Sequence, residues 1–237
     1  RSEKDPSSRT EPSDRRVSSR DCAQAPKSAA AKGVVPRGAR GSIPCAVASP
    51  AGGNVEADGL TFGNTVRIAD VRSCDLICVP GGTNATKVAL DPEFMREIRR
   101  LAQGAKYVTS VCTGSLILGA AGLLKGRRAA CHWAYAELLP IFGAIHDPAR
   151  VARDGNVITG GGVTAGIDFA LTVLAEIGGE TLAQTVQLGL EYAPAPPFDS
   201  GRPDLAPPHV RARYETLRQA WLPERRDGRC RRRPTGR

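Results

Sequence analysis

The sequence predicts an α/β fold with a largely parallel sheet, because short apolar strands alternate with helical patterns along its central part. Strand-like runs rich in β-branched residues lie at 75–79, 107–111 and 156–159, and each leads into a turn of small residues. This order is typical of a parallel sheet covered by helices on its faces. Functional residues then gather at the carboxyl ends of the strands. One domain suffices for the whole pattern.

Charge divides the 237-residue chain into regions. Residues 1–45 carry 10 Lys and Arg against 5 Asp and Glu, residues 200–237 carry 11 against 4, and residues 46–199 carry 12 against 15. The formal charge of +9 therefore belongs to the ends, and no basic groove for nucleic acid is predicted in the centre. We expect 1–45 to be disordered, 46–222 to form the domain, and 223–237 to be a basic disordered tail.

The seven cysteines are odd in number and irregular in spacing, which favours reduced thiols in a cytoplasm over a disulfide framework. The longest apolar run, 116–124, is too short to cross a bilayer, and no secretory signal is expected. Cys74 and Cys78 have no second cysteine pair at zinc-ligand spacing, so the sequence predicts no structural metal.

Local signals predict the individual elements. A short strand is expected at 45–48, followed by a polar stretch through Gly59. Asp91-Pro92 opens a helix with an Asp N-cap and a Pro at the first helical position. The stripe Val210, Tyr214, Leu217 and Trp221 predicts an amphipathic helix that docks on the core, or that offers a partner surface. The remaining expected elements are a strand at 127–131 and helices at 132–139, 164–177 and 184–192.

The segment 106–126 is the candidate site. Its first half is β-branched and apolar like a buried strand, its second half is rich in Leu and Ala like a helix, and Cys112 lies at the switch. Small residues at 113–115 allow a sharp turn that leaves the sulfur at the end of the strand, facing helix amides that favour thiolate over thiol. The alternative is a cysteine buried as a small hydrophobic residue.

Three further segments supply candidate partners for Cys112. Gly81 and Gly82 end a neighbouring strand, and the Gly82 and Thr113 amides could form a two-donor oxyanion hole, although the pattern alone slightly favours a simple tight turn. His132 could manage protons beside the cysteine, or could be structural. The loop 160–162 fits a loose dinucleotide pattern, but no acidic strand end follows, and we interpret it as a wall of the same cleft.

Four runs resemble one known family, in order, over about residues 46–205. They are DLICVPGGTNA, YVTSVCTGSLILGAAGLLKGRRAACHWAY, GNVITGGGVTAGIDFALTVL and QLGLEYAPAPPFDSG. The chain resembles the DJ-1/PfpI superfamily, and within it the isonitrile hydratase branch. The resemblance implies a flavodoxin-like, class I glutamine amidotransferase-like three-layer sandwich, no cofactor, and a homodimer. It also implies that Cys112 is the elbow nucleophile, with Gly82 and Thr113 as oxyanion donors and His132 near the sulfur.

The sequence departs from that family in one respect. The family's first strand and loop supply a carboxylate to the elbow cysteine, but no Asp or Glu within 1–45 has an apolar strand context. Glu56 and Asp58 correspond to a later segment. Loss of this strand would leave its neighbours with unpaired edges. We hypothesise that 1–45 is a non-native segment from a shifted reading frame or a wrong start, which translation of the upstream DNA in all frames would test.

The resemblance implies a cysteine-dependent hydro-lyase that adds water to a small isonitrile and gives an N-substituted formamide, with activity impaired by the missing acid. Peptidase-like members carry His directly after the cysteine, where this chain has Thr113. Two alternatives stay open: a non-enzymatic thiol redox sensor, and a ligand-binding domain related to transcription regulators. Too little chain follows Phe198 for a helix-turn-helix module, and neither membrane association nor specific nucleic-acid binding is expected.

Overall fold

The computed structural model describes residues 44–57 and 60–221. The chain divides between Cys45 and Ala46 into two compact units, and nearly all described residues belong to the second. The expected disorder at 1–45 and the expected tail at 223–237 concern residues that lie, apart from 44 and 45, outside the described part.

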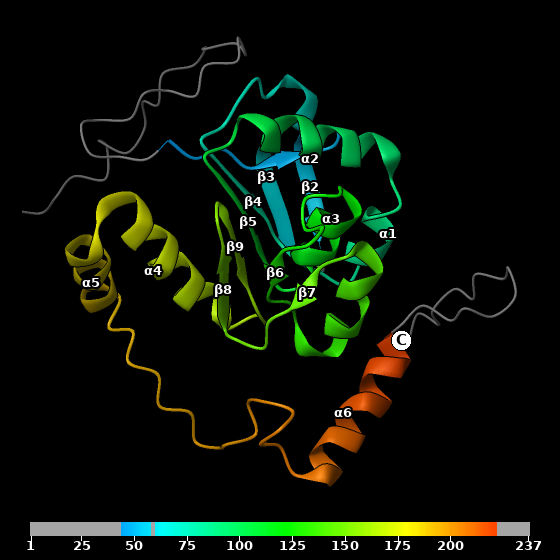
Figure 1. Cartoon of the computed structure of the whole chain (residues 1–237), viewed down its shortest axis with the longest axis vertical. Helices are drawn as coiled ribbons and strands as arrows, with labels where there is room; N and C mark the ends of the chain where they lie inside the picture. The colour runs from blue at the N-terminus through cyan, green and yellow to red at the C-terminus, as the bar shows by residue number, and fades with distance from the viewer. Residues whose placement is uncertain (1–43, 58–59, 222–237) are drawn as a thin grey trace, which may run out of the picture. The chain divides into compact units, whose positions relative to one another are not determined.

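A four-stranded sheet forms the centre of the second unit. Its strands, in spatial order, are β4 (Leu76–Val79), β5 (Tyr107–Val111), β9 (Val157–Gly160) and β8 (Val151–Asp154). The first three are parallel and β8 is antiparallel to β9, so the carboxyl ends of β4, β5 and β9 meet at one edge (Figure 1). The predicted α/β fold with a largely parallel sheet is confirmed.

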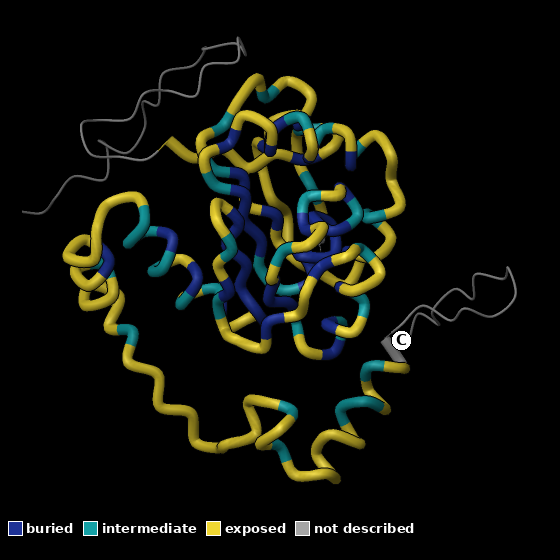
Figure 2. Tube along the Cα trace, in the orientation of Figure 1, coloured by how far each residue is buried: buried dark blue, intermediate teal, exposed yellow. Residues whose placement is uncertain are grey.

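Helices cover both faces of this sheet (Figure 1). On one face, α2 (Pro92–Gly104) and α3 (Gly114–Ala120) pack on Ile77, Val79 and Val108. On the other face, Phe169 and Val173 of α4 (Ala165–Gly178) pack on Ile158. Each such side chain contributes about 1.5–3 kcal/mol when fully buried. Figure 2 shows the buried residues concentrated along the central strands and α3.

Helix α2 begins where the sequence predicts. The Asp91 side chain accepts hydrogen bonds from the amides of Glu93 at 2.9 Å and Phe94 at 3.1 Å, and Pro92 occupies the first turn. Such a cap contributes about 1 kcal/mol. Ile98 and Leu101 are buried on one face of the helix.

The prediction of a polar stretch through Gly59 is wrong. That region forms an antiparallel pair, β2 (Gly53–Ala57) and β3 (Leu60–Arg67), with β1 (Ala48–Ser49) parallel to β3. Most of its side chains are exposed, so the hydrophobic alternation that marks a strand is weak. In the described part of the chain β4 is the outer strand of its sheet, although its apolar sequence is typical of a central one.

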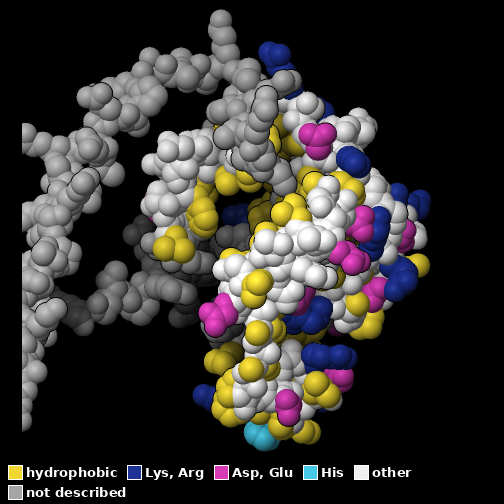
Figure 3. Space-filling view, turned by 90° about the vertical axis from the view of Figure 1, so that its left-hand side faces the viewer, with side chains coloured by type: hydrophobic (Ala, Val, Ile, Leu, Met, Phe, Trp, Pro, Cys, Tyr) yellow, Lys and Arg dark blue, Asp and Glu magenta, His cyan; other side chains and the backbone are white. Residues whose placement is uncertain are grey.

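The remaining elements are short or lie toward the C-terminus. The helix expected after His132 is a 3₁₀ segment, η2 (Trp133–Phe142), which contains Pro140 and is followed by a left-handed Gly143. Figure 3 shows hydrophobic side chains among charged ones on the face seen from the side of α4 and α5 (Glu180–Gly189). No helix within the described ranges is long and apolar enough to span a membrane. The remaining short or C-terminal elements are η1 (Ile68–Asp70), α1 (Ala85–Val88), β6 (Arg128–Ala129), η2 (Trp133–Phe142), β7 (Ile145–His146), α5 (Glu180–Gly189) and α6 (Pro208–Trp221).

Candidate active site

Cys112 occupies the turn between β5 and α3, where its backbone is left-handed, with φ of +61°. This conformation costs a non-glycine residue about 1–3 kcal/mol, so surrounding contacts must enforce it. The Cys112 amide donates to the carbonyl oxygens of Gly160 at 2.9 Å and Gly161 at 2.8 Å, which ties the turn to the end of β9. The predicted strand, sharp turn and helix are confirmed, with a half-buried cysteine at the carboxyl end of the central sheet.

Gly81 is required by close packing against this turn. A Cβ atom at Gly81 would lie 2.6 Å from the Thr113 nitrogen and 2.8 Å from the Cys112 Cβ. A Cβ at Gly114 would lie 2.1 Å from the carbonyl oxygen of Val79. Only glycine fits at either position, because real Cβ atoms do not approach other atoms so closely. The loop after β4 and the elbow after β5 therefore form one packed unit.

Thr113 and Gly82 are joined by two hydrogen bonds. The Thr113 hydroxyl accepts a hydrogen bond from the Gly82 amide at 2.9 Å and donates one to the Gly82 carbonyl at 3.0 Å. The structure thus brings together the residues that the sequence proposes as oxyanion donors. It also gives the Gly82 amide a hydrogen-bond partner on the elbow, so this amide must share or exchange that partner to stabilise a substrate. Its role as a donor stays a prediction.

A network of buried hydroxyl groups stabilises the elbow. The hydroxyls of Ser110 and Ser115 lie 2.9 Å apart, and Ser115 donates to the Ala130 carbonyl at 2.6 Å. The Ala130 amide in turn donates to the Thr159 hydroxyl at 2.8 Å. These three hydroxyl residues have no exposed surface, so each bond has no competing water and fixes β5, α3 and β9 to the segment before His132. Sequence analysis missed this network, since isolated Ser and Thr in strands carry no distinctive pattern.

His132 caps η2 and lies against the loop that follows β9. Its Nδ1 accepts a hydrogen bond from the Ala134 amide at 3.2 Å, which leaves the proton of the neutral ring on Nε2. Burial lowers the pKa of His132 from its ordinary 6.5, so the ring is neutral at pH 7. A Cβ at Gly162 would meet the ring at 3.4 Å, which places the loop after β9 against it. The capping role is observed, and a proton-managing role through Nε2 stays a prediction.

Aromatic rings continue from His132 toward the C-terminal helix. The His132 ring centroid is 6.0 Å from those of Trp133 and Tyr135, and Trp133 is 5.0 Å from Tyr214 of α6. Burial raises the pKa of the Tyr214 phenol, and the neighbouring Tyr135 and Cys112 add to the rise. The expected docking of α6 on the core therefore occurs through Tyr214. The sequence predicted the helix but not the ring that it meets.

A second cysteine lies close to the elbow. Cys131 is buried, and burial, with a smaller contribution from Cys112, raises its pKa to about 12. It is therefore a neutral thiol at any physiological pH and a poor candidate for a nucleophile. In the described part of the chain no carboxylate hydrogen-bonds to the Cys112 side chain, and no cluster of three or more His, Cys, Asp or Glu residues could hold a metal ion.

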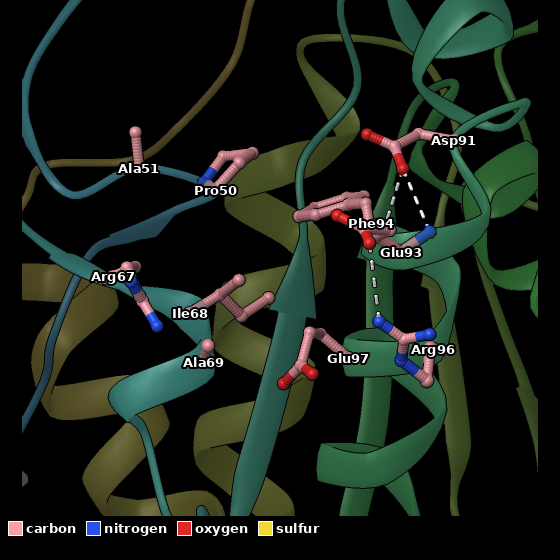
Figure 4. Close-up of a pocket in the computed structure, with 10 residues that line it drawn as sticks. All are labelled: Pro50, Ala51, Arg67, Ile68, Ala69, Asp91, Glu93, Phe94, Arg96 and Glu97. Carbon is pink, nitrogen blue, oxygen red and sulfur yellow. Dashed lines mark hydrogen bonds and ion pairs between the residues drawn. The ribbon is translucent and has the colours of Figure 1, made fainter.

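The cavity drawn in Figure 4 lies away from this site. Its volume is about 470 Å³, and its acidic and basic side chains pair among neighbours, as in the Arg96–Glu93 contact of 3.7 Å. It holds no cysteine or histidine, so it offers no nucleophile. Its lining residues are Pro50, Ala51, Arg67, Ile68, Ala69, Asp91, Glu93, Phe94, Arg96 and Glu97.

Comparison with known proteins decides the family. The profile of the DJ-1/PfpI family matches residues 33–176, which is more than half of the chain. The chain belongs to the DJ-1/PfpI family. The match begins ahead of residue 46, so the family sequence extends further toward the N-terminus than the quoted motifs.

Several members of the DJ-1/PfpI family are similar over most of this domain. Isonitrile hydratase from Pseudomonas putida is 59% identical over 152 residues, which cover 64% of this chain and 67% of that protein. A THiJ/PfpI family protein from Pseudomonas syringae superposes with a TM-score of 0.71 at 43% identity, covering 75% of this chain and 74% of that structure. The HTH-type transcriptional regulator CdhR from Pseudomonas aeruginosa is 32% identical, over 59% of this chain and 42% of the regulator.

Proposed function

We propose that this chain is a cofactor-free, cysteine-dependent hydro-lyase that adds water to an organic isonitrile and forms an N-substituted formamide. One observation carries the proposal: Cys112 is held at φ of +61° on an elbow, in a chain 59% identical to an isonitrile hydratase. A strained cysteine at the carboxyl edge of a parallel sheet is suited to covalent catalysis.

The proposed reaction balances with water alone. The Cys112 thiolate adds to the terminal carbon of R–N≡C, and that carbon takes up a proton to give R–N=CH–S–Cys112. Water then adds across the C=N bond, with its oxygen on carbon and a proton on nitrogen. The C–S electron pair returns to sulfur, the hydroxyl proton is released, and R–NH–CHO leaves. The protein supplies the nucleophile and positions the two reactants.

The other site residues have proposed roles that follow from their hydrogen bonds. The Thr113 hydroxyl both donates and accepts, so it can relay a proton if its contact with Gly82 is exchanged. The neutral His132 ring offers Nε2–H to the substrate nitrogen or to the attacking water. No carboxylate from the described residues is in place to orient that water, so we expect turnover slower than an acid-containing site would give.

The function is tested by incubating the full chain with cyclohexyl isonitrile and following N-cyclohexylformamide by NMR. Formamide above the uncatalysed rate, with its oxygen derived from ¹⁸O-labelled water, supports the proposal. Saturable binding without formamide contradicts hydration and favours the ligand-binding alternative. Mild peroxide treatment that oxidises Cys112 selectively, without any isonitrile turnover, favours the redox sensor.

A further inference from the structure

Among the α6 side chains that the structure describes, Tyr214 makes an aromatic contact with the domain. The Tyr214 ring lies 5.0 Å from the Trp133 ring, with the planes tilted by 44°. One turn later the Arg218 guanidinium lies over the Tyr135 ring, 6.0 Å from its centroid. Val210 and Leu217 belong to the same stripe but remain 38% and 41% exposed. Of these three described residues of the stripe, Tyr214 is therefore the one that packs on the domain.

A chain of neighbouring contacts connects the Trp133–Tyr214 pair to the elbow cysteine. Trp133 directly follows His132, whose ring faces Gly162, and the preceding Gly161 carbonyl holds the Cys112 amide at 2.8 Å. The electrostatic influence of Cys112 on the Tyr214 phenol agrees with this placement. Trp133 keeps 39% of its surface exposed, so part of the indole is open to a bound molecule.

An isonitrile has a linear R–N≡C axis, so its geometry determines where the R group goes. When the terminal carbon reaches the Cys112 sulfur, the R group must project away from the sulfur. Aromatic faces that line this direction would bury an apolar R group, and edge or stacked ring contacts add about 0.5–1.5 kcal/mol to simple burial. An anionic R group would gain nothing from such a surface, because the faces of aromatic rings carry partial negative charge.

We propose that Trp133 and Tyr214 form an aromatic wall that binds the apolar R group of the isonitrile and selects bulky over small substrates. The inference rests on the proposed function for the identity of the substrate. It assigns to α6, which lies more than 90 residues after the elbow in the sequence, a part in substrate recognition. The wall determines binding, and Cys112 determines reaction.

The kinetic test compares cyclohexyl isonitrile with methyl isonitrile in the full chain. Tyr214→Ala is expected to raise KM for the cyclohexyl substrate by roughly tenfold, the size of one lost ring contact. The kcat of Tyr214→Ala for the cyclohexyl substrate should stay within about twofold of the parent value. Its kcat and KM for the methyl substrate should do the same, because these constants do not depend on the aromatic wall. Tyr214→Phe keeps the ring and should match the parent. Leu217→Ala, on the same helix, controls for loss of helix stability, and circular dichroism checks folding.

A binding test separates the wall from the chemistry. Cys112→Ala combined with Trp221→Phe leaves Trp133 as the fluorophore, and its quenching by cyclohexyl isonitrile measures binding without turnover. If Tyr214→Ala weakens this binding, the aromatic wall is supported, even when the parent forms no formamide and the proposed function is wrong. If Tyr214→Ala changes neither binding nor KM, or changes the two substrates equally, the wall is wrong even when hydration is confirmed.

Discussion

The Thr113 hydroxyl holds both backbone polar groups of Gly82, accepting from its amide at 2.9 Å and donating to its carbonyl at 3.0 Å. These residues are 31 positions apart and come from the turns after adjacent strands. One buried side chain therefore fixes the distance between the elbow and the loop that faces it. The elbow and the facing loop are therefore held together. Substitutions that change only the shape or only the polarity of a side chain can test each contact.

Thr113→Val keeps the shape of the side chain and removes the hydroxyl. Both contacts with Gly82 are lost, and we expect isonitrile hydration to fall on the order of 100-fold, the usual effect of losing one positioned polar group. The free energy of unfolding should fall by about 1 kcal/mol. Thr113→Ser restores the hydroxyl and serves as the control. The measurements are kcat/KM and urea denaturation; equal activity in both variants would remove Thr113 from the mechanism.

Gly81→Ala should disrupt the site through sterics. The new Cβ would lie 2.6 Å from the Thr113 nitrogen and 2.8 Å from the Cys112 Cβ, so the loop after β4 must move. Overpacking of this kind costs about 1–3 kcal/mol. Gly82→Ala is the matched control, because nothing lies within 4 Å of its Cβ position. Thermal melting and turnover should separate the two variants, and similar losses in both would argue against this packing.

His132 should make stability depend on pH. Burial lowers its pKa below 6.5 in the folded chain, so in the window just below pH 6.5 the unfolded chain binds more protons. The free energy of unfolding must therefore fall as the pH drops through this window. His132→Asn retains an acceptor for the Ala134 amide but cannot titrate. Melting temperatures from about pH 7.5 to about pH 5.5 should fall less steeply in the variant than in the parent; parallel curves would contradict a buried neutral ring.

Ser115→Ala should reveal the energetic role of the buried hydroxyl network. It removes the donor to the Ala130 carbonyl and the partner of Ser110, both without access to water, and each unsatisfied group costs about 1–3 kcal/mol. Thr185→Ala is the control, because its hydroxyl also bonds a backbone carbonyl but lies exposed on α5, where the change should be below about 0.5 kcal/mol. Equal denaturation midpoints would show that the network is dispensable.

Sequence analysis located the elements whose signals are local. The Asp91 cap, the buried strands and the turn at Cys112 each combine a residue preference with an apolar run, and all are present in the structure. The β2–β3 pair was missed because its side chains are largely exposed and alternate weakly, and β8 was missed because it is short and half of its residues, Arg153 and Asp154, are charged. An Asp58-Gly59 dipeptide, a frequent hairpin signal, was the available clue.

The candidate site was predictable only in outline. The carboxyl ends of parallel strands place Cys112, Gly82 and the 160–162 loop at one edge, which the alternating order of elements already implies. The double contact of Thr113 with Gly82 depends on a side-chain rotamer that sequence does not encode locally. The meeting of Trp133 with Tyr214 joins residues 81 positions apart, and no periodicity specifies which face of a helix such a distant ring will contact.

The central claim is that the Cys112 sulfur carries out the hydration, and Cys112→Ala tests it most directly. The measurement is the initial rate of N-cyclohexylformamide formation from cyclohexyl isonitrile, compared among the parent, Cys112→Ala and Cys45→Ala. Cys45 is exposed and lies outside the site, so its variant controls for removal of any thiol. We predict no formamide above background from Cys112→Ala and an unchanged rate from Cys45→Ala. Undiminished formamide formation by Cys112→Ala would contradict the mechanism.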